Sequence, residues 1–327
     1  MADAVRVGLV GTGGMMRTHM RNLQSIHDAK VVALVDPDQG HIAGVLKQFP
    51  ELASCHTYGD YKQMLDKEGL DAILIASPHF AHRDQILDGL RAGLHVLSEK
   101  PMVCTIEDAK LVMKAEKAAG KMVGVAYQRH TQAEFRFMKK CIESGAPGEL
   151  QFISAFQGQD WLRGTKGSWR QVMEMSCGGQ LNDSGSHLID IILWVSGLKA
   201  SRVTASIENF DSEVDINSAL TIDFANGAMG NISVVGNCPV FWEDITFVCA
   251  EWSFFLRNGK LTYCTGGRGE ILTLDRAQYG ENNPTRNFID AILGRQELLA
   301  PSVCGLRTIE LTEAAWRSAA SGEPVTL

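Results

Sequence analysis

The stretch VRVGLVGTGGMM, residues 5–16, sets the architecture of this chain. Its first six residues form a mostly apolar run typical of a buried strand, and glycines follow at once before a helical pattern that ends at about residue 27. Gly11 permits a tight turn, and Gly13 lets backbone N–H groups approach a pyrophosphate at the helix N-terminus, with further room at Gly14. Met16 stands where this fingerprint has a third small residue, which predicts a slightly shifted helix.

The next apolar run supplies the acid that completes the pattern. VVALVDPD, residues 31–38, reads as a strand that ends in Asp36, twenty residues after Met16. A carboxylate there accepts hydrogen bonds from the ribose hydroxyls of an adenosine and repels a 2′-phosphate. The stretch therefore predicts NAD as the cofactor in preference to NADP. The alternative is a solvated acid at a strand end before Pro37.

Strands and helices continue to alternate as far as residue 126, which predicts a doubly wound parallel sheet of six strands in a domain spanning residues 1–128. Ligands of such sheets bind beyond the carboxyl ends of the strands, where the triplets 77–79 (Ser-Pro-His) and 99–101 (Glu-Lys-Pro) fall. We expect helices at 41–49, 61–67, 80–92 and 106–119, and strands at 71–77, 95–97 and 122–126.

The pattern changes in residues 129–327. Strand-like runs follow one another without helices between them, and Asn-Gly pairs at 226–227 and 258–259 predict hairpin turns. We therefore expect an α+β domain with a large, mainly antiparallel sheet that carries the substrate side of the site. Its strands are predicted at 150–157, 202–210, 219–224, 229–235, 245–248, 253–256 and 271–274, and its helices at 134–143, 284–298 and 304–319.

The stretch CGGQLNDSGSHLIDIILW, residues 177–194, carries a candidate acid–base pair on a predicted helix. Asp183 and His187 stand four residues apart, so their side chains would share one helix face. A carboxylate beside an imidazole fixes its tautomer and suits it to act as a general base. Asp190 lies within one turn of His187. The alternative reading is a helix cap formed by Asp183 or Ser184, with His187 merely hydrogen-bonded.

The loop QDWLRGTKGSWR, residues 159–170, combines aromatic and basic groups just before that helix. Trp161 and Trp169 are either core residues or aromatic faces that suit the C–H surface of a sugar. Arg163 and Lys166 either bind an acidic substituent of the substrate or are solvated loop charges. Residues 127–129 (Tyr-Gln-Arg) end the sixth strand and are expected to face the cleft.

Composition excludes several classes of protein. The 327 residues carry a net charge of −7 and no basic block, which argues against nucleic acid or an anionic membrane as the main partner. No apolar run is long enough to span a membrane, and the start lacks the features of a signal peptide. Eight cysteines without a C-x-x-C pair read as reduced thiols of a cytoplasmic protein, and the nine histidines show no metal-ligand spacing, so we expect no catalytic metal.

Taken together, these motifs resemble the Gfo/Idh/MocA oxidoreductase family, which includes inositol dehydrogenases and glucose–fructose oxidoreductases. The resemblance covers nearly the whole chain. It rests on GTGGMM at 11–16, SPHFAH at 77–82, AGLHVLSEKPM at 92–102, SWR at 168–170, NDSGSHLID at 182–190 and the C-terminal run from NFIDAILG to GEPVTL. Glu-Lys-Pro together with D-x-x-x-H about eighty residues later is the specific combination.

The resemblance implies a set of site residues. Lys100, Asp183 and His187 would meet at the nicotinamide as the catalytic set, and His79 departs from the asparagine common at its position. Implied cofactor contacts are Gly11, Gly13, Gly14, Met15, Met16, Asp36, Ser77, Pro78, His79, His82, Glu99, Lys100, Gln128, Trp169 and Arg170. Expected substrate contacts are Lys100, Arg129, Trp161, Arg163, Asp183 and His187. The resemblance also implies a homodimer or homotetramer, and the open sheet is the surface we expect to be buried against another subunit.

The expected activity is hydride transfer between NAD and a ring hydroxyl or ketone of a sugar, glycoside or cyclic polyol. In this reading, His187, oriented by Asp183, takes the hydroxyl proton, while Lys100 stabilises charge on the oxygen and lowers the pKa of the imidazole. The alternative is that Lys100 itself relays the proton. One rival is a glycoside-cleaving enzyme that keeps NAD bound, oxidises C3 transiently, eliminates the aglycone and reduces the ring again. The other rival is a non-enzymatic regulator that senses NAD.

Overall fold

The computed structural model describes residues 4–266, 272–274, 279 and 282–327, and it divides into two compact units. The first unit comprises residues 1–128 and 282–306, and the second comprises residues 129–281 and 307–327. The segment 282–306 therefore belongs to the first unit, although it follows most of the second unit in the sequence. Among the described residues, no helix combines the length and apolar character needed to cross a membrane.

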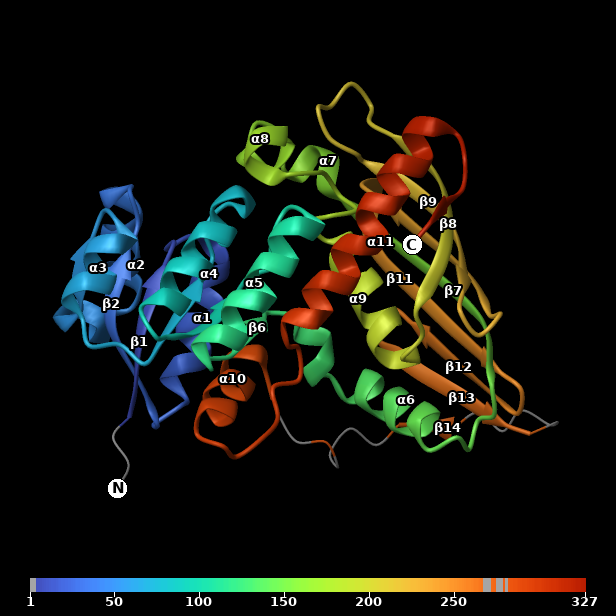
Figure 1. Cartoon of the computed structure of the whole chain (residues 1–327), viewed down its shortest axis with the longest axis horizontal. Coiled ribbons are helices and arrows are strands. Elements are labelled where there is room, and N and C mark those ends of the chain that lie inside the picture. The colour runs from blue at the N-terminus through green and yellow to red at the C-terminus, as the bar shows by residue number, and fades with distance from the viewer. Residues whose placement is uncertain (1–3, 267–271, 275–278, 280–281) are drawn as a thin grey trace. The chain divides into compact units, whose positions relative to one another are not determined.

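The first unit is built on a six-stranded sheet in which every neighbouring pair is parallel. Its strands are β1 (Val5–Val10), β2 (Ala29–Val35), β3 (His56–Tyr58), β4 (Ala72–Ile75), β5 (His95–Ser98) and β6 (Val123–Val125). They lie in the order β3-β2-β1-β4-β5-β6, so the chain winds outward from β1 in both directions (Figure 1). The predicted doubly wound parallel sheet is confirmed.

Helices pack on both faces of this sheet because its strands are apolar on both sides. The helices are α1 (Gly14–Gln24), α2 (Gln39–Gln48), α3 (Tyr61–Lys67), α4 (His82–Arg91), α5 (Ile106–Ala119) and α10 (Pro284–Ile292), with short 3₁₀ turns η1 (Pro50–Ser54) and η2 (His79–Ala81). Alternate residues of β1 show the division: Leu9 joins the core that contains α1 and α10, whereas Gly8 faces Met64 of α3.

α10 belongs to the first unit because its apolar face fills that core. Phe288 and Ile289 are fully buried among residues of β1, β4 and α1. Each such side chain stabilises the unit by roughly 1.5–3 kcal/mol through removal of apolar surface from water. Asn283 caps this helix by accepting a hydrogen bond from the Arg286 N–H, and Pro284 occupies its first turn.

The second unit is built on a nine-stranded sheet in the order β14-β13-β12-β11-β7-β10-β9-β8-β15, which is antiparallel except where β7 and β10 pair in parallel. The predicted large, mainly antiparallel sheet is confirmed. Its strands are β7 (Leu150–Asp160), β8 (Ala200–Glu208), β9 (Asn217–Phe224), β10 (Met229–Val235), β11 (Asn237–Cys249), β12 (Trp252–Arg257), β13 (Lys260–Thr265), β14 (Leu272–Thr273) and β15 (Val325–Thr326). Ile271 of the predicted strand 271–274 lies outside the described residues.

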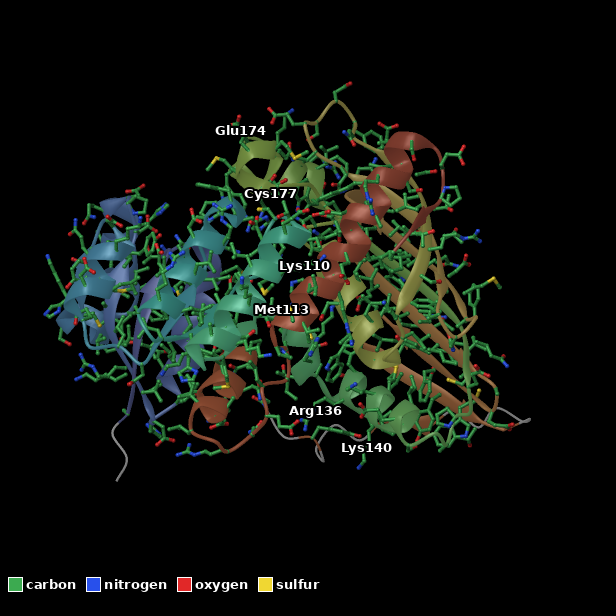
Figure 2. All side chains as sticks on the ribbon, viewed as in Figure 1. Lys110, Met113, Arg136, Lys140, Glu174 and Cys177 are labelled. Atoms are coloured by element: carbon green, nitrogen blue, oxygen red, sulfur yellow. The ribbon has the colours of Figure 1, made fainter. Side chains whose placement is uncertain are left out.

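Three helices cover one face of this sheet, and no helix of the described residues covers the other, which is called the uncovered face below (Figure 1). They are α6 (Ala133–Glu143), α9 (Gly185–Ser196) and α11 (Ser302–Ser321), whose first turns are assigned to the first unit. Alternate residues of the strands and apolar residues of these helices share one core. Arg136, labelled on α6 in Figure 2, donates a hydrogen bond to the Tyr279 carbonyl. Its guanidinium lies 5.5 Å from the centre of the Tyr279 ring.

One tight turn of the second unit has the geometry that its sequence predicts. Asn258 and Gly259 join β12 to β13 with φ angles of 45° and 79°. Positive φ at both central residues is the signature of a type I′ hairpin turn, which matches the twist of antiparallel strands. Strand β13, which this turn begins, is nevertheless absent from the sequence prediction.

The prediction that all eight cysteines are reduced thiols is wrong for two of them. Cys104 and Cys177 are disulfide-bonded, whereas the other six cysteines are thiols. The absence of a C-x-x-C pair bears only on cysteines that are neighbours in the sequence. Cys177 itself ends the short helix α8 (Met173–Ser176) in a left-handed conformation, with φ of 57° (Figure 2).

A buried carboxylate fixes the turn that leads into α9. Asp215 accepts hydrogen bonds from the Gly179 N–H at 2.9 Å, the Leu181 N–H at 2.7 Å and the Trp316 indole N–H at 3.0 Å. Burial raises the pKa of Asp215 above its ordinary value, although these three donors oppose that effect. The Gly178–Gly179 pair makes the close approach possible, because a Cβ on Gly179 would lie 1.9 Å from the Asp215 carbonyl oxygen.

We predict that Gly179→Ala destabilises the second unit by about 3 kcal/mol or more, since overpacking against backbone cannot relax through a side-chain rotation. The matched control is Gly164→Ala in α7 (Trp161–Gly164), where an added Cβ meets no atom within 4 Å. The midpoint of urea unfolding measures both variants. Equal midpoints would show that the Asp215 turn does not need its glycine.

Candidate active site

The carboxyl ends of neighbouring strands bring the predicted cofactor residues of the first unit to one edge of its sheet. Gly11 follows β1, Asp36 follows β2, Ser77 lies just beyond β4, Glu99 follows β5 and Gln128 comes shortly after β6. Because all six strands are parallel, these positions share the edge where ligands of doubly wound sheets bind. The sequence pattern alone predicted this gathering.

The turn after β1 is open on the side where an anion would bind. Gly11 has a φ of 82°, and a Cβ there would lie 2.8 Å from the Ala76 carbonyl oxygen, so only glycine fits. By contrast, a Cβ on Gly13 or Gly14 would meet no atom within 4 Å. Gly13 is the N-cap of α1 and offers no side-chain cap to its amides. Residues and space at this turn therefore fit a pyrophosphate group.

Asp36 holds this turn in place from the end of β2. One carboxylate oxygen accepts hydrogen bonds from both the Thr12 N–H at 2.8 Å and the Thr12 hydroxyl at 2.9 Å. The other oxygen accepts the Asp38 N–H at 2.9 Å and lies 3.4 Å from Nδ1 of His41. Asp36 is thus a buried and anchored acid, not a solvated one. Sequence reasoning missed Thr12, which is fully buried between the two turns.

Two loops at the ends of β4 and β5 carry the next group of predicted residues. In the first, the Ser77 hydroxyl donates to Oε1 of Gln85 at 2.6 Å, and His79 is buried with its ring centre 5.8 Å from that of His82. His82 is fully buried, and its ring nitrogens point at backbone carbonyls. The second loop, residues 99–101, carries Lys100 next to β5.

Glu99 points into the first unit and binds a histidine that sequence reasoning missed. Oε1 of Glu99 lies 3.0 Å from Nε2 of His19 on α1, and Nδ1 of His19 lies 2.8 Å from the Thr285 hydroxyl. Oε2 of Glu99 accepts the Lys100 N–H at 3.3 Å. Burial alone would favour the neutral acid, but the hydrogen bond and charge at His19, with Lys100, hold the pKa of Glu99 below its ordinary value.

In the second unit, Asp183 gathers residues of the aromatic loop around one carboxylate oxygen. Oδ2 of Asp183 accepts the Trp161 indole N–H at 2.9 Å and the Arg170 Nε–H at 3.1 Å. The Arg170 guanidinium also lies 4.5 Å from the centre of the Trp169 ring. Sequence reasoning named all four residues, and the fold brings them together. Trp161 is buried in a small cluster with Val214 and Ile216.

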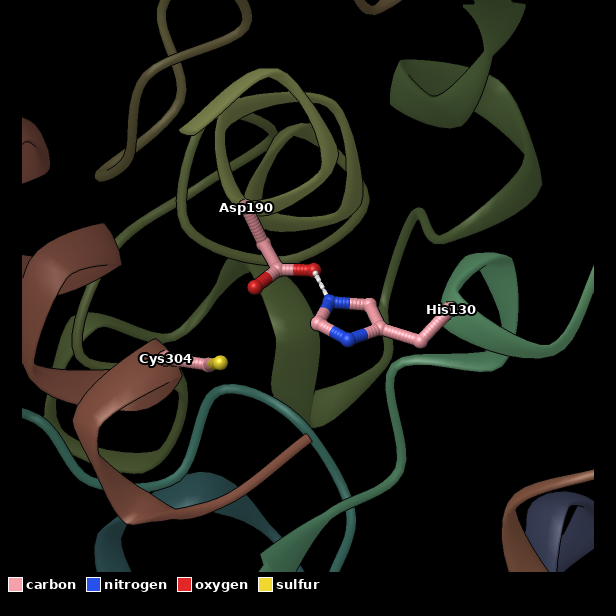
Figure 3. Close-up of side chains that lie close together, drawn as sticks. All are labelled: His130, Asp190 and Cys304. Carbon is pink, nitrogen blue, oxygen red and sulfur yellow. Dashed lines mark hydrogen bonds and ion pairs between the residues drawn. The ribbon is translucent and has the colours of Figure 1, made fainter. Parts of the chain in front are cut away.

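His187 lies in the first turn of α9, which begins at Gly185. Asp183 therefore precedes the helix, in the turn closed by its N–H and the Gly179 carbonyl at 2.9 Å. Ser184 occupies the N-cap position but makes no side-chain cap hydrogen bond, so the alternative of a Ser184 side-chain cap is wrong. Three residues beyond His187, Asp190 binds Nε2 of His130 at 2.7 Å, and both side chains are buried (Figure 3).

The two predicted substrate arginines of the second unit lie in different surroundings. Arg129 is buried and forms an ion pair with Glu243 of β11. Arg163 is exposed and pairs with Asp160 at 2.8 Å, three residues earlier in the chain. This contact favours the reading of Arg163 as a solvated loop charge.

Comparison with known proteins assigns both parts of the chain to one family. A family model described as "Oxidoreductase family, NAD-binding Rossmann fold" matches residues 5–127, and the "GFO/IDH/MocA C-terminal domain" model matches residues 135–253. The chain belongs to the Gfo/Idh/MocA oxidoreductase family. The resemblance drawn from its motifs is thereby confirmed, as is a first domain of the NAD-binding type.

The relatives of this Gfo/Idh/MocA protein share about a quarter of its residues, and several of them align with nearly its whole length. Inositol 2-dehydrogenase 1 of Saccharopolyspora erythraea is 25% identical over 98% of this chain and 96% of the relative. Glucose-6-phosphate 3-dehydrogenase of Bacillus subtilis is 26% identical, over 62% of this chain and only 56% of that relative. The crystal structure of the WlbA dehydrogenase of Bordetella pertussis, in complex with NADH and UDP-GlcNAcA, shares the fold with a TM-score of 0.84, 24% identity and coverage of 100% and 98%.

The contacts of Glu99 predict how the stability of the first unit of this family member depends on pH. Because the pKa of Glu99 is depressed in the folded state, its contribution to stability is present above its ordinary pKa of about 4.3 and is lost as pH falls through the folded value. We expect Glu99→Gln to unfold at lower urea than wild type at pH 7, and the gap to narrow as pH falls below the ordinary pKa of the Glu99 carboxyl.

Exposed Asp66 provides the control for this prediction. Asp66→Asn removes a carboxyl from the same unit without touching the His19 network, and its unfolding midpoint should follow wild type at both pH values. A Glu99→Gln gap that persists unchanged at pH 3 would show that the ionised Glu99 carboxylate is not the stabilising form.

Proposed function

We propose that this protein is an NAD-dependent oxidoreductase that transfers a hydride between the nicotinamide and a ring hydroxyl or ketone of a sugar, glycoside or cyclic polyol. The observation that carries the proposal is the open glycine turn after β1, which is fixed by the Asp36 carboxylate and begins a helix with no side-chain cap. Asp36 would accept hydrogen bonds from the adenosine ribose and repel a 2′-phosphate, which favours NAD over NADP.

The substrate class is supported by the relatives. Their names describe dehydrogenases of inositol and of glucose 6-phosphate, and a levoglucosan dehydrogenase in complex with NADH shares the fold with a TM-score of 0.87 and 21% identity. In this chain, the half-buried Trp169 ring lies 4.5 Å from the Arg170 guanidinium, and an aromatic face beside a polar group suits a ring with apolar C–H faces and polar edges.

We assign the acid–base work to Lys100, Asp183 and His187. Bound NAD supplies an acceptor for the hydride that leaves the carbinol carbon. In the oxidative direction, the His187 imidazole takes the proton of the reacting hydroxyl, and the Lys100 ammonium stabilises the negative charge that develops on its oxygen. Loss of the proton and of the hydride converts the alcohol to a ketone, and reduction runs the same steps backward.

Asp183 would orient and stabilise the imidazolium formed on His187. Its carboxylate is already anchored by the Trp161 indole and the Arg170 guanidinium, so it cannot rotate away without breaking two hydrogen bonds. The remaining cofactor contacts are assigned to the strand-end residues. They are Gly11, Gly13, Gly14, Met15, Met16, Ser77, Pro78, His79 and Gln128.

A further proposal concerns assembly: a second copy of the chain covers the uncovered face of the nine-stranded sheet. Glu243 of β11 is buried on the inner side, so its neighbour Trp242 alternates to the outer side and is 44% exposed. Phe241 is 54% exposed beside it. The same face has a hollow of about 450 Å³ lined by β7–β10, including Phe156 and Val235. A projecting tryptophan and a hollow on one face are complementary features for a symmetric pair.

For the acid–base assignment, we predict that Lys100→Met and His187→Asn each lower turnover at least a hundredfold, because each removes a group that acts on the transition state. The dissociation constant for NADH, measured by fluorescence, should stay within about threefold of wild type. Lys110→Met on exposed α5 and exposed His27→Asn are matched controls and should keep full turnover. Near-normal turnover in either active-site variant would end that assignment.

The substrate for these assays comes from a screen of sugars, inositols and glycosides with NAD, in which absorbance of NADH and product masses are followed in parallel. A dehydrogenase produces NADH and a product lighter by two hydrogens. Release of phenol from an aryl glycoside without net NADH would instead assign the glycoside-cleaving reaction. If the screen yields neither, the enzymatic proposal fails.

For assembly, we predict a dimer or tetramer by light scattering at micromolar concentration, and a smaller species for Trp242→Lys. The lysine would place an unpaired charge in the buried interface, and burying that charge would destabilise the assembly. Phe210→Lys changes a comparably exposed aromatic in the turn after β8 and should leave the mass unchanged. A monomeric wild type would contradict the proposal.

A further inference from the structure

His82 occupies an unusual position for a residue whose motif predicts cofactor contact. It is the first residue of α4 and is fully buried. Its Nδ1 lies 2.8 Å from the carbonyl oxygen of Pro101, and its Nε2 lies 3.0 Å from the carbonyl oxygen of Ser77. Both ring nitrogens therefore face backbone carbonyls of the first unit.

The two carbonyls belong to different loops at the same edge of the sheet. Ser77 lies just beyond β4, and Pro101 follows Lys100 beyond β5, the neighbouring parallel strand. The loops 77–79 and 99–101 come from separate parts of the sequence, and the imidazole spans the gap between them. One side chain thus connects the segment that carries Lys100 with the segment expected to contact the nicotinamide.

Chemistry limits how the ring can satisfy both loops. A carbonyl oxygen only accepts hydrogen bonds, and a neutral imidazole carries a single N–H, so it donates to one loop at a time. Burial lowers the pKa of His82, and the Lys100 ammonium acts in the same direction, whereas the two carbonyls and the Glu99 carboxylate oppose it. The His79 ring is the other titratable group beside it. In its neutral form, His82 is a brace whose tautomer selects the loop it holds.

Each loop also has a second anchor on its other side. Glu99 accepts the Lys100 N–H at 3.3 Å and is itself held by His19 of α1. The Ser77 hydroxyl donates to Gln85, which lies one turn beyond His82 on α4. The main chain around Lys100 is therefore fixed between α1 and α4, and His82 is the component that couples it to the Ser77 loop.

We infer that His82 is a positioning residue that braces the loops 77–79 and 99–101 and so sets where Lys100 and the nicotinamide contacts lie. The consequence for turnover rests on the proposed role of Lys100, while the brace itself does not. A displacement of about 1 Å at a reacting group lowers turnover by as much as a hundredfold, so a loosened loop has a measurable cost.

Two substitutions separate the arms of the brace. An asparagine amide nitrogen reaches the position of Nδ1 and keeps the bond to Pro101, whereas a glutamine amide nitrogen reaches the position of Nε2 and keeps the bond to Ser77. Amide hydrogen exchange of the full chain without cofactor reports each loop directly. We expect His82→Asn to speed exchange about tenfold in residues 77–81 only, and His82→Gln to do so in residues 99–103 only.

Leu90→Ala is the matched control, since it opens a cavity on the same helix without touching either loop. If both His82 variants speed exchange equally in both loops, or if neither changes exchange more than Leu90→Ala does, the brace is overturned. The comparison between His82→Asn and His82→Gln does not need a His82→Ala variant, whose empty space in the core could prevent folding.

Binding and turnover test the functional consequence. His82→Gln should lower kcat about 10- to 100-fold with the NADH dissociation constant within about threefold of wild type, while His82→Asn should mainly weaken NADH binding. The expected exchange pattern with unchanged kcat in His82→Gln would overturn the positioning role. If Lys100→Met itself keeps turnover, the proposed function fails while the exchange pattern still decides the brace.

Discussion

The hydrogen bonds from Thr12 to the Asp36 carboxylate are the contact on which the nucleotide side of this protein depends. They join the end of β2 to the turn after β1 and keep that turn open without any side chain over its glycines. A carboxylate that accepts a backbone N–H and a hydroxyl on one oxygen is far less mobile than a solvated one. The same acid that would recognise the ribose therefore also shapes the turn that would receive the pyrophosphate.

Buried carboxylates play a similar part around α9 in the second unit. Asp215 fixes the Gly178–Gly179 turn, and Asp183 anchors Trp161 and Arg170. Asp190, which lies on α9 itself, binds His130 (Figure 3). Leaving such groups without partners in the protein interior is costly, so each one commits a neighbouring segment to a single arrangement. Together they set the start and the rotation of the helix that carries His187.

Local patterns were enough to predict much of this fold. Helices α3 and α5 occupy the residues expected from their apolar spacing, and the two sheet types follow from whether helices separate the strands. The prediction of six strands assigned ranges to only five of them. The strand without a range is β3, because His56–Tyr58 is short and not buried, so no apolar run marks it. The irregular start of β11 was missed for a different reason: its exposed residues 240–242 carry no alternation.

Some residues of the candidate site can be predicted from nearby sequence, and others are apparent only from contacts between distant parts of the chain. Glycines, Asp36, Lys100 and the pair Asp183 and His187 stand in motifs that can be read along the chain. His19 and Asp215 act on partners 80 and 36 residues away, and nothing in their immediate sequence marks them. The same is true of the inward orientation of Glu99 and His82, which only the packing of α1 and α4 on the sheet determines.

The central proposal is that the Lys100 ammonium and the His187 imidazole act on one substrate oxygen beside NAD. A crystal structure of the chain with NAD and the substrate found by screening measures this directly. The account predicts that Nζ of Lys100 and a ring nitrogen of His187 both lie within about 3 Å of the reacting oxygen. A complex in which either group is beyond hydrogen-bond reach of that oxygen, with the reacting carbon still at the nicotinamide, would contradict it.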